Sequence, residues 1–277
     1  MLAQPSLDHV IVCGKDLTSM RARLAAAGVP TVYGGRHSNR ATEMALASFP
    51  DGTFLELLAI QPDADAEAVA TYVWTRQLNE DAGPCAWSVN PRDINAEVQR
   101  LRAAGVPVGE PKHGMRNRTD GKRVEWEASQ MGPEPEGTFF PYLQHDVTPR
   151  ALRAFPQGKP TNPDFNGVTT VVIAVRNLDG AIGRFQQAYG IPAPSRQADP
   201  AFGAQLARLG NVPVILAEPL NRQSWLNGRL QQFGEGPCAY ILSRKSGQHI
   251  AVSKTRWFGV DISWMDAATL GWHLGFE

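Results

Sequence analysis

The chain has 277 residues, of which 43% are hydrophobic and 19% charged, a composition typical of one large or two smaller globular domains. Its 27 Lys and Arg residues equal its 27 Asp and Glu residues, so a neutral surface offers no general attraction for nucleic acid. No apolar run approaches the ~18 residues of a membrane span, and the N-terminus lacks the basic start and apolar core of a signal peptide. Three cysteines without a CxxC motif are typical of reduced thiols. We therefore expect a cytoplasmic protein with no membrane and no nucleic-acid partner.

A helix followed by a turn is predicted three times along the chain. Residues 16–30, 93–107 and 177–192 each begin with Asp or Asn, continue with a helical pattern and end in Gly-x-Pro. The first side chain caps free N–H groups, Gly adopts the left-handed conformation at the helix end, and Pro prevents further helix. We therefore predict three similar helices.

Strand-like runs flank each predicted helix. One run precedes each helix, at residues 7–12, 86–89 and 171–175. Further runs follow at residues 42–49 and 53–60, at 123–128 and 138–144, and at 204–209 and 212–217. The repeating unit therefore reads β-α-β-β-β, with its second strand poorly marked.

A second repeat marks a larger period. The sequence GPCAW at residues 83–87 recurs as GPCAY at residues 236–240, which indicates four units in two similar halves. The fourth unit is short, because residues 243–248 are too polar and too few for a helix. The Pro-rich residues 147–166 are typical of an irregular surface linker. We predict an N-terminal domain of two units (1–146), a linker (147–166) and a C-terminal domain with a shortened second unit (167–277).

Several local sequences carry a family resemblance over nearly the whole chain. They are LDHVIV at 7–12, GGRH at 34–37, ATEMAL at 41–46, DGTFLELLA at 51–59 and DVTPR at 146–150. With four tandem units, they resemble the vicinal oxygen chelate superfamily, and its glyoxalase-like domain proteins in particular. The resemblance implies an α+β fold in which tandem βαβββ modules pair into cupped, mostly antiparallel half-barrels. Helices would lie on the convex side, and unit one can pair with unit two or with unit four.

The resemblance also places the first and fourth strands of a unit side by side, which brings His9 next to Glu56. Alternation along the strands is compatible, because His9 shares a face with Ile11, and Glu56 shares a face with Phe54. An imidazole and a carboxylate suit a divalent metal such as Fe, Mn, Zn, Ni or Co. His9 and Glu56 are therefore candidate catalytic residues and metal ligands, or alternatively a metal-free polar pair for acid–base work.

The other units depart from the family's ligand pattern. Ala86 takes the histidine position of the second unit, and Tyr142 takes the glutamate position as an uncommon ligand or a substrate contact. In the C-terminal half, Thr170 and Val214 stand at the two ligand positions. We therefore expect the second cup to be a packing partner rather than a metal site.

Further polar residues are candidates around the first cup. His145 is a candidate third ligand or general base, or alternatively a loop histidine. Arg36 and His37 follow two glycines near the expected mouth of the pocket, where they bind an anionic group or form an ordinary polar loop. Glu43 contacts either the ligand or solvent. The basic stretch 112–123 is expected to be a solvated hairpin rather than a nucleic-acid contact.

Two functions remain open. The first is a glyoxalase-like lyase, isomerase or dioxygenase that binds a small oxygenated molecule in the N-terminal cup. The second is a non-catalytic small-molecule binding protein of the bleomycin-resistance type. No Walker loop, GxGxxG, HExxH or GxSxG motif is present, so no nucleotide cofactor is expected. The resemblance also makes a homodimer a candidate assembly.

Overall fold

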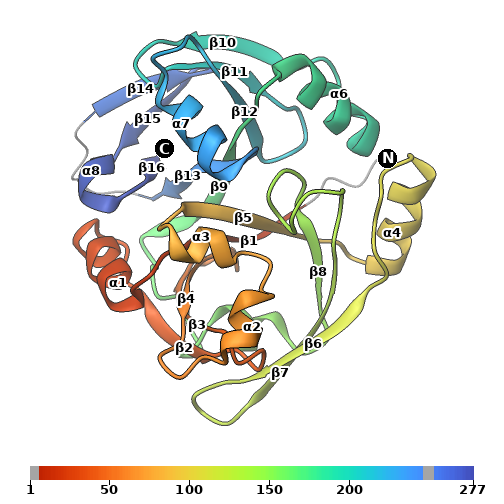
Figure 1. The fold of residues 1–277 in the computed structure, drawn as a ribbon, viewed down its shortest axis with the longest axis vertical. Helices are drawn as coiled ribbons and strands as arrows, with labels where there is room; N and C mark the ends of the chain where they lie inside the picture. Colours follow the sequence, from red (N-terminus) through yellow and green to blue (C-terminus); the bar gives the residue numbers. More distant parts are fainter. Residues whose placement is uncertain (1–5, 246–252) are drawn as a thin grey trace.

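Two eight-stranded sheets form the body of the molecule, with helices around them (Figure 1). The computed structural model describes residues 6–245 and 253–277. In spatial order, the first sheet consists of β2 (Val32–Arg36), β3 (Thr42–Ser48), β4 (Phe54–Ile60), β1 (Ser6–Cys13), β5 (Gly83–Asn90), β8 (Tyr142–Asp146), β7 (Arg123–Ser129) and β6 (Lys112–Asn117). The second sheet consists of β10 (Ser195–Asp199), β11 (Ala204–Arg208), β12 (Val214–Pro219), β9 (Phe165–Ala174), β13 (Gly236–Arg244), β16 (His273–Phe276), β15 (Val260–Trp264) and β14 (Ser253–Trp257).

The order of the strands shows how the four units pair. Within each unit the first and last strands are parallel neighbours, as β1 is to β4 and β5 is to β8. Units one and two join through the antiparallel pair β1–β5, and units three and four join through β9–β13. The α+β prediction of cupped, mostly antiparallel half-barrels is confirmed, and unit one pairs with unit two.

The three repeated helices are confirmed as α1 (Leu17–Ala26), α4 (Ile94–Ala103) and α6 (Leu178–Tyr189). Asp16, Asp93 and Asn177 each accept a hydrogen bond from a backbone N–H in the first turn of the helix that follows. Each helix packs on its own sheet, on the face opposite the cup. Five shorter helices complete the fold within the described part of the chain: α2 (Ala66–Ala70), α3 (Thr75–Asn79), α5 (Arg150–Ala154), α7 (Trp225–Phe233) and α8 (Ala267–Leu270).

The two halves share one hydrophobic core. The rings of Phe49 and Phe165, one from each half, lie 5.7 Å apart within this core. The hydroxyl of Tyr240, in the second GPCA repeat, donates to the carbonyl oxygens of Ile11 at 2.8 Å and Ala86 at 2.9 Å. The central strands of the first sheet are therefore fastened to the second half.

The structure corrects two expectations about local structure. Residues 147–166 are not an irregular surface linker, because they contain α5 and bury Arg153 and Ala154. The run at residues 138–144 becomes a strand only from Tyr142 onward. The expectation of a missing helix at residues 243–248 lies partly outside the described residues.

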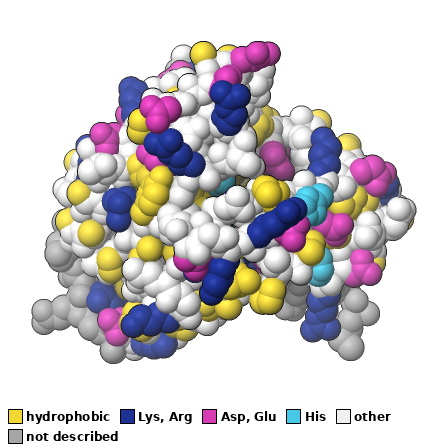
Figure 2. Space-filling view, turned by 90° about the horizontal axis from the view of Figure 1, so that it is seen from below, with side chains coloured by type: hydrophobic (Ala, Val, Ile, Leu, Met, Phe, Trp, Pro, Cys, Tyr) yellow, Lys and Arg dark blue, Asp and Glu magenta, His cyan; other side chains and the backbone are white. Residues whose placement is uncertain are grey.

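The molecular surface is mixed in charge. On the face shown in Figure 2, positive and negative side chains are interspersed, in keeping with a net charge of zero. Among the described residues, no helix combines the length and the apolar character needed to cross a bilayer.

Candidate active site

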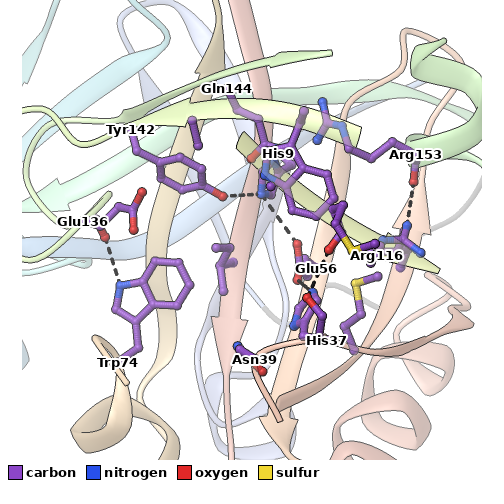
Figure 3. Close-up of a pocket in the computed structure, with 18 of the residues that line it drawn as sticks. His9, His37, Asn39, Glu56, Trp74, Arg116, Glu136, Tyr142, Gln144 and Arg153 are labelled. Carbon is purple, nitrogen blue, oxygen red and sulfur yellow. Dashed lines mark hydrogen bonds and ion pairs between the residues drawn. The ribbon is translucent and has the colours of Figure 1, made fainter. Parts of the chain in front are cut away.

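A cavity of about 300 Å³ lies in the cup of the N-terminal half. His9 on β1, Glu56 on β4 and Tyr142 on β8 point into it from the sheet, and His37 enters from the loop after β2 (Figure 3). The segment between β4 and β5, which contains α2 and α3, adds Trp74 to the cavity wall. The cavity therefore combines several titratable groups with aromatic surface, which is typical of a small-molecule site.

A β-bulge in β1 gives His9 an unusual partner, its chain neighbour Asp8. The pairing of β1 with β5 shifts register between Leu7 and His9, so Asp8 is the extra residue. In a regular strand consecutive side chains point to opposite faces. Here His9 Nδ1 lies 2.5 Å from Asp8 Oδ1, and both side chains are buried. The bulge thus allows Asp8 to orient the imidazole.

Asp8 is held as a carboxylate by two arginines. Arg153 donates to both of its oxygens, at 2.9 and 2.6 Å, and Arg150 also donates to it. Burial alone would raise the pKa of Asp8, but Arg153 and the hydrogen bond from His9 hold that pKa well below its usual range. Asp146 completes the cluster by accepting from Arg153 Nε at 2.5 Å and from Arg150 at 3.2 Å. Two carboxylates and two guanidinium groups therefore balance one another behind the cavity wall.

The ionised carboxylate of Asp8 sets the tautomer of His9. Because Asp8 accepts, Nδ1 carries the proton, and Nε2 is the basic nitrogen that faces the cavity. The hydroxyl of Tyr142 donates to Nε2 at 2.6 Å, and burial raises the pKa of this phenol well above its usual value. The imidazole also stacks on Phe54, with 4.6 Å between ring centroids. His9 is therefore fixed on three sides, with its basic nitrogen at the cavity.

Glu56 sits between two histidines. One carboxylate oxygen lies 3.6 Å from His9 Nε2, and the other lies 3.5 Å from His37 Nε2. Burial lowers the pKa of His37, so this imidazole is neutral at pH 7, and its Nδ1 lies 2.8 Å from the hydroxyl of Thr42. These distances leave the Glu56 carboxylate available to a bound molecule.

The structure does not bring every predicted residue to this cavity. Arg36 is half-exposed and pairs with Asp63 at 3.2 Å. Glu43 accepts a hydrogen bond from Tyr33 at 2.9 Å. His145 alternates with the two cavity-facing residues of β8, and its Nδ1 lies 3.0 Å from the carbonyl oxygen of Pro91. His9, His37, Glu56 and Tyr142 are brought together, whereas Arg36, Glu43 and His145 lie outside the cavity wall.

Comparison with protein families agrees with this architecture. The family model described as "Glyoxalase-like domain" matches residues 7–169, more than half of the chain. The chain belongs to the glyoxalase-like domain family. No curated protein sequence matches it.

Solved structures resemble this glyoxalase-like protein to different extents. A hypothetical protein from Staphylococcus aureus is similar over 98% of both chains, with 15% identity and a TM-score of 0.67, and so shares the fold. Methylmalonyl-CoA epimerase from Mycobacterium tuberculosis is 18% identical over 41% of this chain and 87% of its own, with a TM-score of 0.36.

The sequence predicted that His9 and Glu56 of this glyoxalase-like domain hold a divalent metal, and the positions of their donor atoms bear on that prediction. Two ligands of one ion, each about 2.1 Å from it, lie roughly 3.0 Å apart at an octahedral angle and roughly 3.4 Å apart at a tetrahedral angle. The nearest Glu56 oxygen is 3.6 Å from His9 Nε2, close to the tetrahedral spacing, and in this structure that nitrogen accepts the Tyr142 hydroxyl. Within residues 6–245 and 253–277, no three or more His, Cys, Asp or Glu side chains are placed to hold an ion. The described residues therefore do not supply the three protein ligands that a catalytic metal site of this kind uses.

The second cup of the glyoxalase-like chain is filled by side chains. Strand pairing aligns Ile11 with Glu56 in the first sheet and Val172 with Ile215 in the second. Ile215, rather than Val214 as expected, therefore takes the Glu56 position. It belongs to an apolar cluster that contains Phe202 and several tryptophans.

Two arginines of the cavity were missed by sequence reasoning. Arg116, 4% exposed, lies in the stretch that was expected to be a solvated hairpin, and Arg153, 3% exposed, lies in the expected linker. Arg118 also turns inward, where it donates to carbonyl oxygens at the end of α5. The sequence DVTPR at 146–150, just before Arg153, was the part of this segment that carries the family resemblance.

Proposed function

We propose that the N-terminal cavity catalyses proton transfer on a small carbonyl compound, as an isomerase or lyase does, with His9 as the base. The observation that carries the proposal is the hydrogen-bonded chain from Asp8 through His9 to Tyr142, which ends in the cavity. A base needs a free lone pair, a fixed orientation and a partner that stabilises its protonated form. The ionised Asp8 fixes the orientation of the imidazole and stabilises its protonated form, as the carboxylate does in other histidine bases.

The chemistry follows from the two hydrogen-bonding roles of Tyr142. When a carbonyl compound enters, His9 Nε2 removes a proton from the carbon next to the carbonyl group. The electron pair of that C–H bond forms a C=C bond, the π pair of the carbonyl group moves onto its oxygen, and an enolate results. The neutral Tyr142 hydroxyl turns from Nε2 to this oxygen and donates to it, which stabilises the developing charge. Return of the proton to the same or a neighbouring atom completes an isomerisation.

Glu56 supports the charged form of His9. After proton transfer the imidazole is a cation, and the carboxylate of Glu56 lies 3.6 Å from the new N–H. The attraction between these charges is stronger inside the cavity than in water, because the local dielectric constant is lower. His37, neutral at pH 7, is left as a hydrogen-bonding group toward the ligand.

Deuterium uptake tests the proposal directly. The protein, purified without nickel resin, is incubated in D₂O with small ketones, aldehydes and 2-oxo acids, and loss of the C–H signal next to the carbonyl is followed by ¹H NMR. We expect enzyme-dependent exchange with at least one compound. His9→Asn should slow this exchange by roughly 10²- to 10⁴-fold. His113→Asn is the matched control, because His113 is half-exposed and lies outside the cavity, and it should leave the rate unchanged.

Two outcomes would favour other functions. Tight binding of a compound without any exchange in the wild type would support a binding protein of the bleomycin-resistance type. Stoichiometric metal by elemental analysis, lost in a His9→Ala, Glu56→Ala double variant together with exchange, would support the metal-dependent alternative instead.

A further inference from the structure

Arg116 places an unneutralised guanidinium in the wall of the N-terminal cavity. It lies on β6 and is 4% exposed, and Figure 3 shows it beside the group formed by Glu56 and His37. Its Nη1 donates to the carbonyl oxygen of Gly34 at 3.2 Å, and its Nη2 donates to that of Arg153 at 3.3 Å. These bonds use only part of its fork of N–H donors. Across the described residues, no carboxylate forms an ion pair with it.

The neighbouring arginines are different. Arg153 also lines the cavity, but its charge is taken up by Asp8 at 2.6 Å and Asp146 at 2.5 Å. Arg118, two residues further along, forms an ion pair at 3.0 Å with the aspartate that follows it closely in sequence. Arg116 is therefore the cavity-lining arginine whose charge lacks a contacting counter-ion among the described residues.

Keeping this charge in the cavity wall is unfavourable for the ligand-free protein. Burial lowers the pKa of Arg116 to about 10, and the more distant Glu56 counteracts this only in part. A buried charge without a partner destabilises a fold, and such groups are retained where they serve a site. A bound anion would supply the missing partner.

We infer that the ligand of this cavity carries a carboxylate and that Arg116 binds it. A guanidinium matches a carboxylate through two parallel hydrogen bonds. A phosphate dianion would bring a second negative charge, and among the described residues no further unpaired cation lines the cavity to balance it. The inference rests on the proposed function for its site: with the carboxylate at Arg116, an adjacent carbonyl group faces His9 and Tyr142. The indole rings of Trp74 and Trp126, which also line the cavity, accept the apolar remainder.

The inference places the anion inside the cavity rather than at its mouth. Arg36, the last residue of β2, and Arg40, in the loop after it, are both exposed, and they pair with Asp63 and Asp65, each at 3.2 Å. Their charges are therefore already balanced at the surface, where a further ion pair contributes little.

A binding experiment that does not depend on turnover tests the inference. Pyruvate and phenylpyruvate are titrated against the protein by ligand-observed NMR, in parallel with pyruvamide and phenylpyruvamide, which have the same shape without the charge. The wild type should bind the acids roughly 10- to 100-fold more tightly than the amides. Arg116→Met should abolish this preference, Arg116→Lys should retain part of it, and Arg123→Gln on the exposed side of the neighbouring strand should leave it intact.

The outcomes separate this inference from the proposed function. Equal binding of acids and amides by the wild type, no binding of any acid, or an unchanged preference in Arg116→Met would overturn it, whatever the exchange assay shows. Inorganic phosphate that binds more tightly than pyruvate would overturn the carboxylate assignment. A preference that depends on Arg116, without proton exchange, would support the inference and refute the proposed function. His9→Asn should keep the preference while losing exchange.

Discussion

The side chains of Asp8 and His9 are hydrogen-bonded to each other although the two residues are consecutive in a β-strand. The register shift between β1 and β5 makes this possible, and it places a carboxylate held by Arg153 directly behind the imidazole. The same carboxylate therefore balances buried arginine charges and orients the base. Changes at Asp8 are expected to affect stability and catalysis together.

Asp8→Asn should destabilise the fold by roughly 3 kcal/mol at pH 7, because a buried arginine loses its counter-charge. The folded pKa of Asp8 is lowered, so its contribution is fully present above the unfolded value near 4 and is lost as pH falls through the folded value. Urea unfolding of the wild type should therefore show a loss of stability in acid that the variant lacks in part. Asp63→Asn at the exposed Arg36 pair is the control and should change stability by less than about 0.5 kcal/mol. Equal acid dependence in wild type and Asp8→Asn would contradict the assignment.

Tyr142→Phe should separate catalysis from stability. Loss of one buried hydrogen bond costs about 1 kcal/mol of stability, whereas loss of the oxyanion donor should slow proton exchange by about 10²-fold. The measurements are thermal unfolding and deuterium uptake on the same preparation. Tyr33→Phe removes a hydroxyl bonded to Glu43 outside the cavity and should leave the exchange rate unchanged. A Tyr142→Phe variant with the full exchange rate would remove Tyr142 from the mechanism.

The fold could be predicted from the sequence because its signals are local and repeated. The caps at Asp16, Asp93 and Asn177 and the recurring GPCA sequence need no knowledge of tertiary contacts. The family resemblance predicted that His9 and Glu56 are neighbours, and strand alternation was compatible with it, because the pairing of β1 with β4 is regular from His9 onward.

The rest of the site depends on contacts between distant segments. Asp8 was missed because alternation assigns it to the face opposite His9, and a bulge leaves no mark in a sequence of this kind. Arg153 was missed because the prolines of residues 147–166 indicate a surface loop. In the structure, Arg153 on α5 binds Asp8 in β1, 145 positions earlier in the chain. Arg116 was hidden among exposed basic neighbours, and only the β6–β7 pairing shows which of them turns inward.

Tyr240→Phe should loosen the attachment of the first sheet to the second half. Its hydroxyl serves two buried carbonyl oxygens, those of Ile11 and Ala86, and leaving them without this donor costs about 1–3 kcal/mol. Amide hydrogen exchange should become faster in β1 and β5 relative to the outer strands β2 and β6. Unchanged protection of β1 and β5, with the same free energy of unfolding, would show that this contact contributes nothing.

His273→Phe should remove part of the acid sensitivity of the C-terminal half. His273 is packed against Trp225, with 4.2 Å between ring centroids, and burial, aided by Arg229, lowers its pKa to about 4. Since the folded pKa is lowered, the unfolded chain binds the proton first. The wild type should therefore lose up to about 3 kcal/mol of stability as pH falls from 6.5 to 4. Phe cannot titrate but preserves the ring contact, so His273→Phe should lose less stability over this pH window. The control His113→Gln, at a half-exposed histidine, should follow the wild type. The measurement is the free energy of unfolding in urea at several pH values. Parallel curves for the wild type and His273→Phe would contradict the prediction, and would show that the second cup is open to water rather than filled by packed side chains.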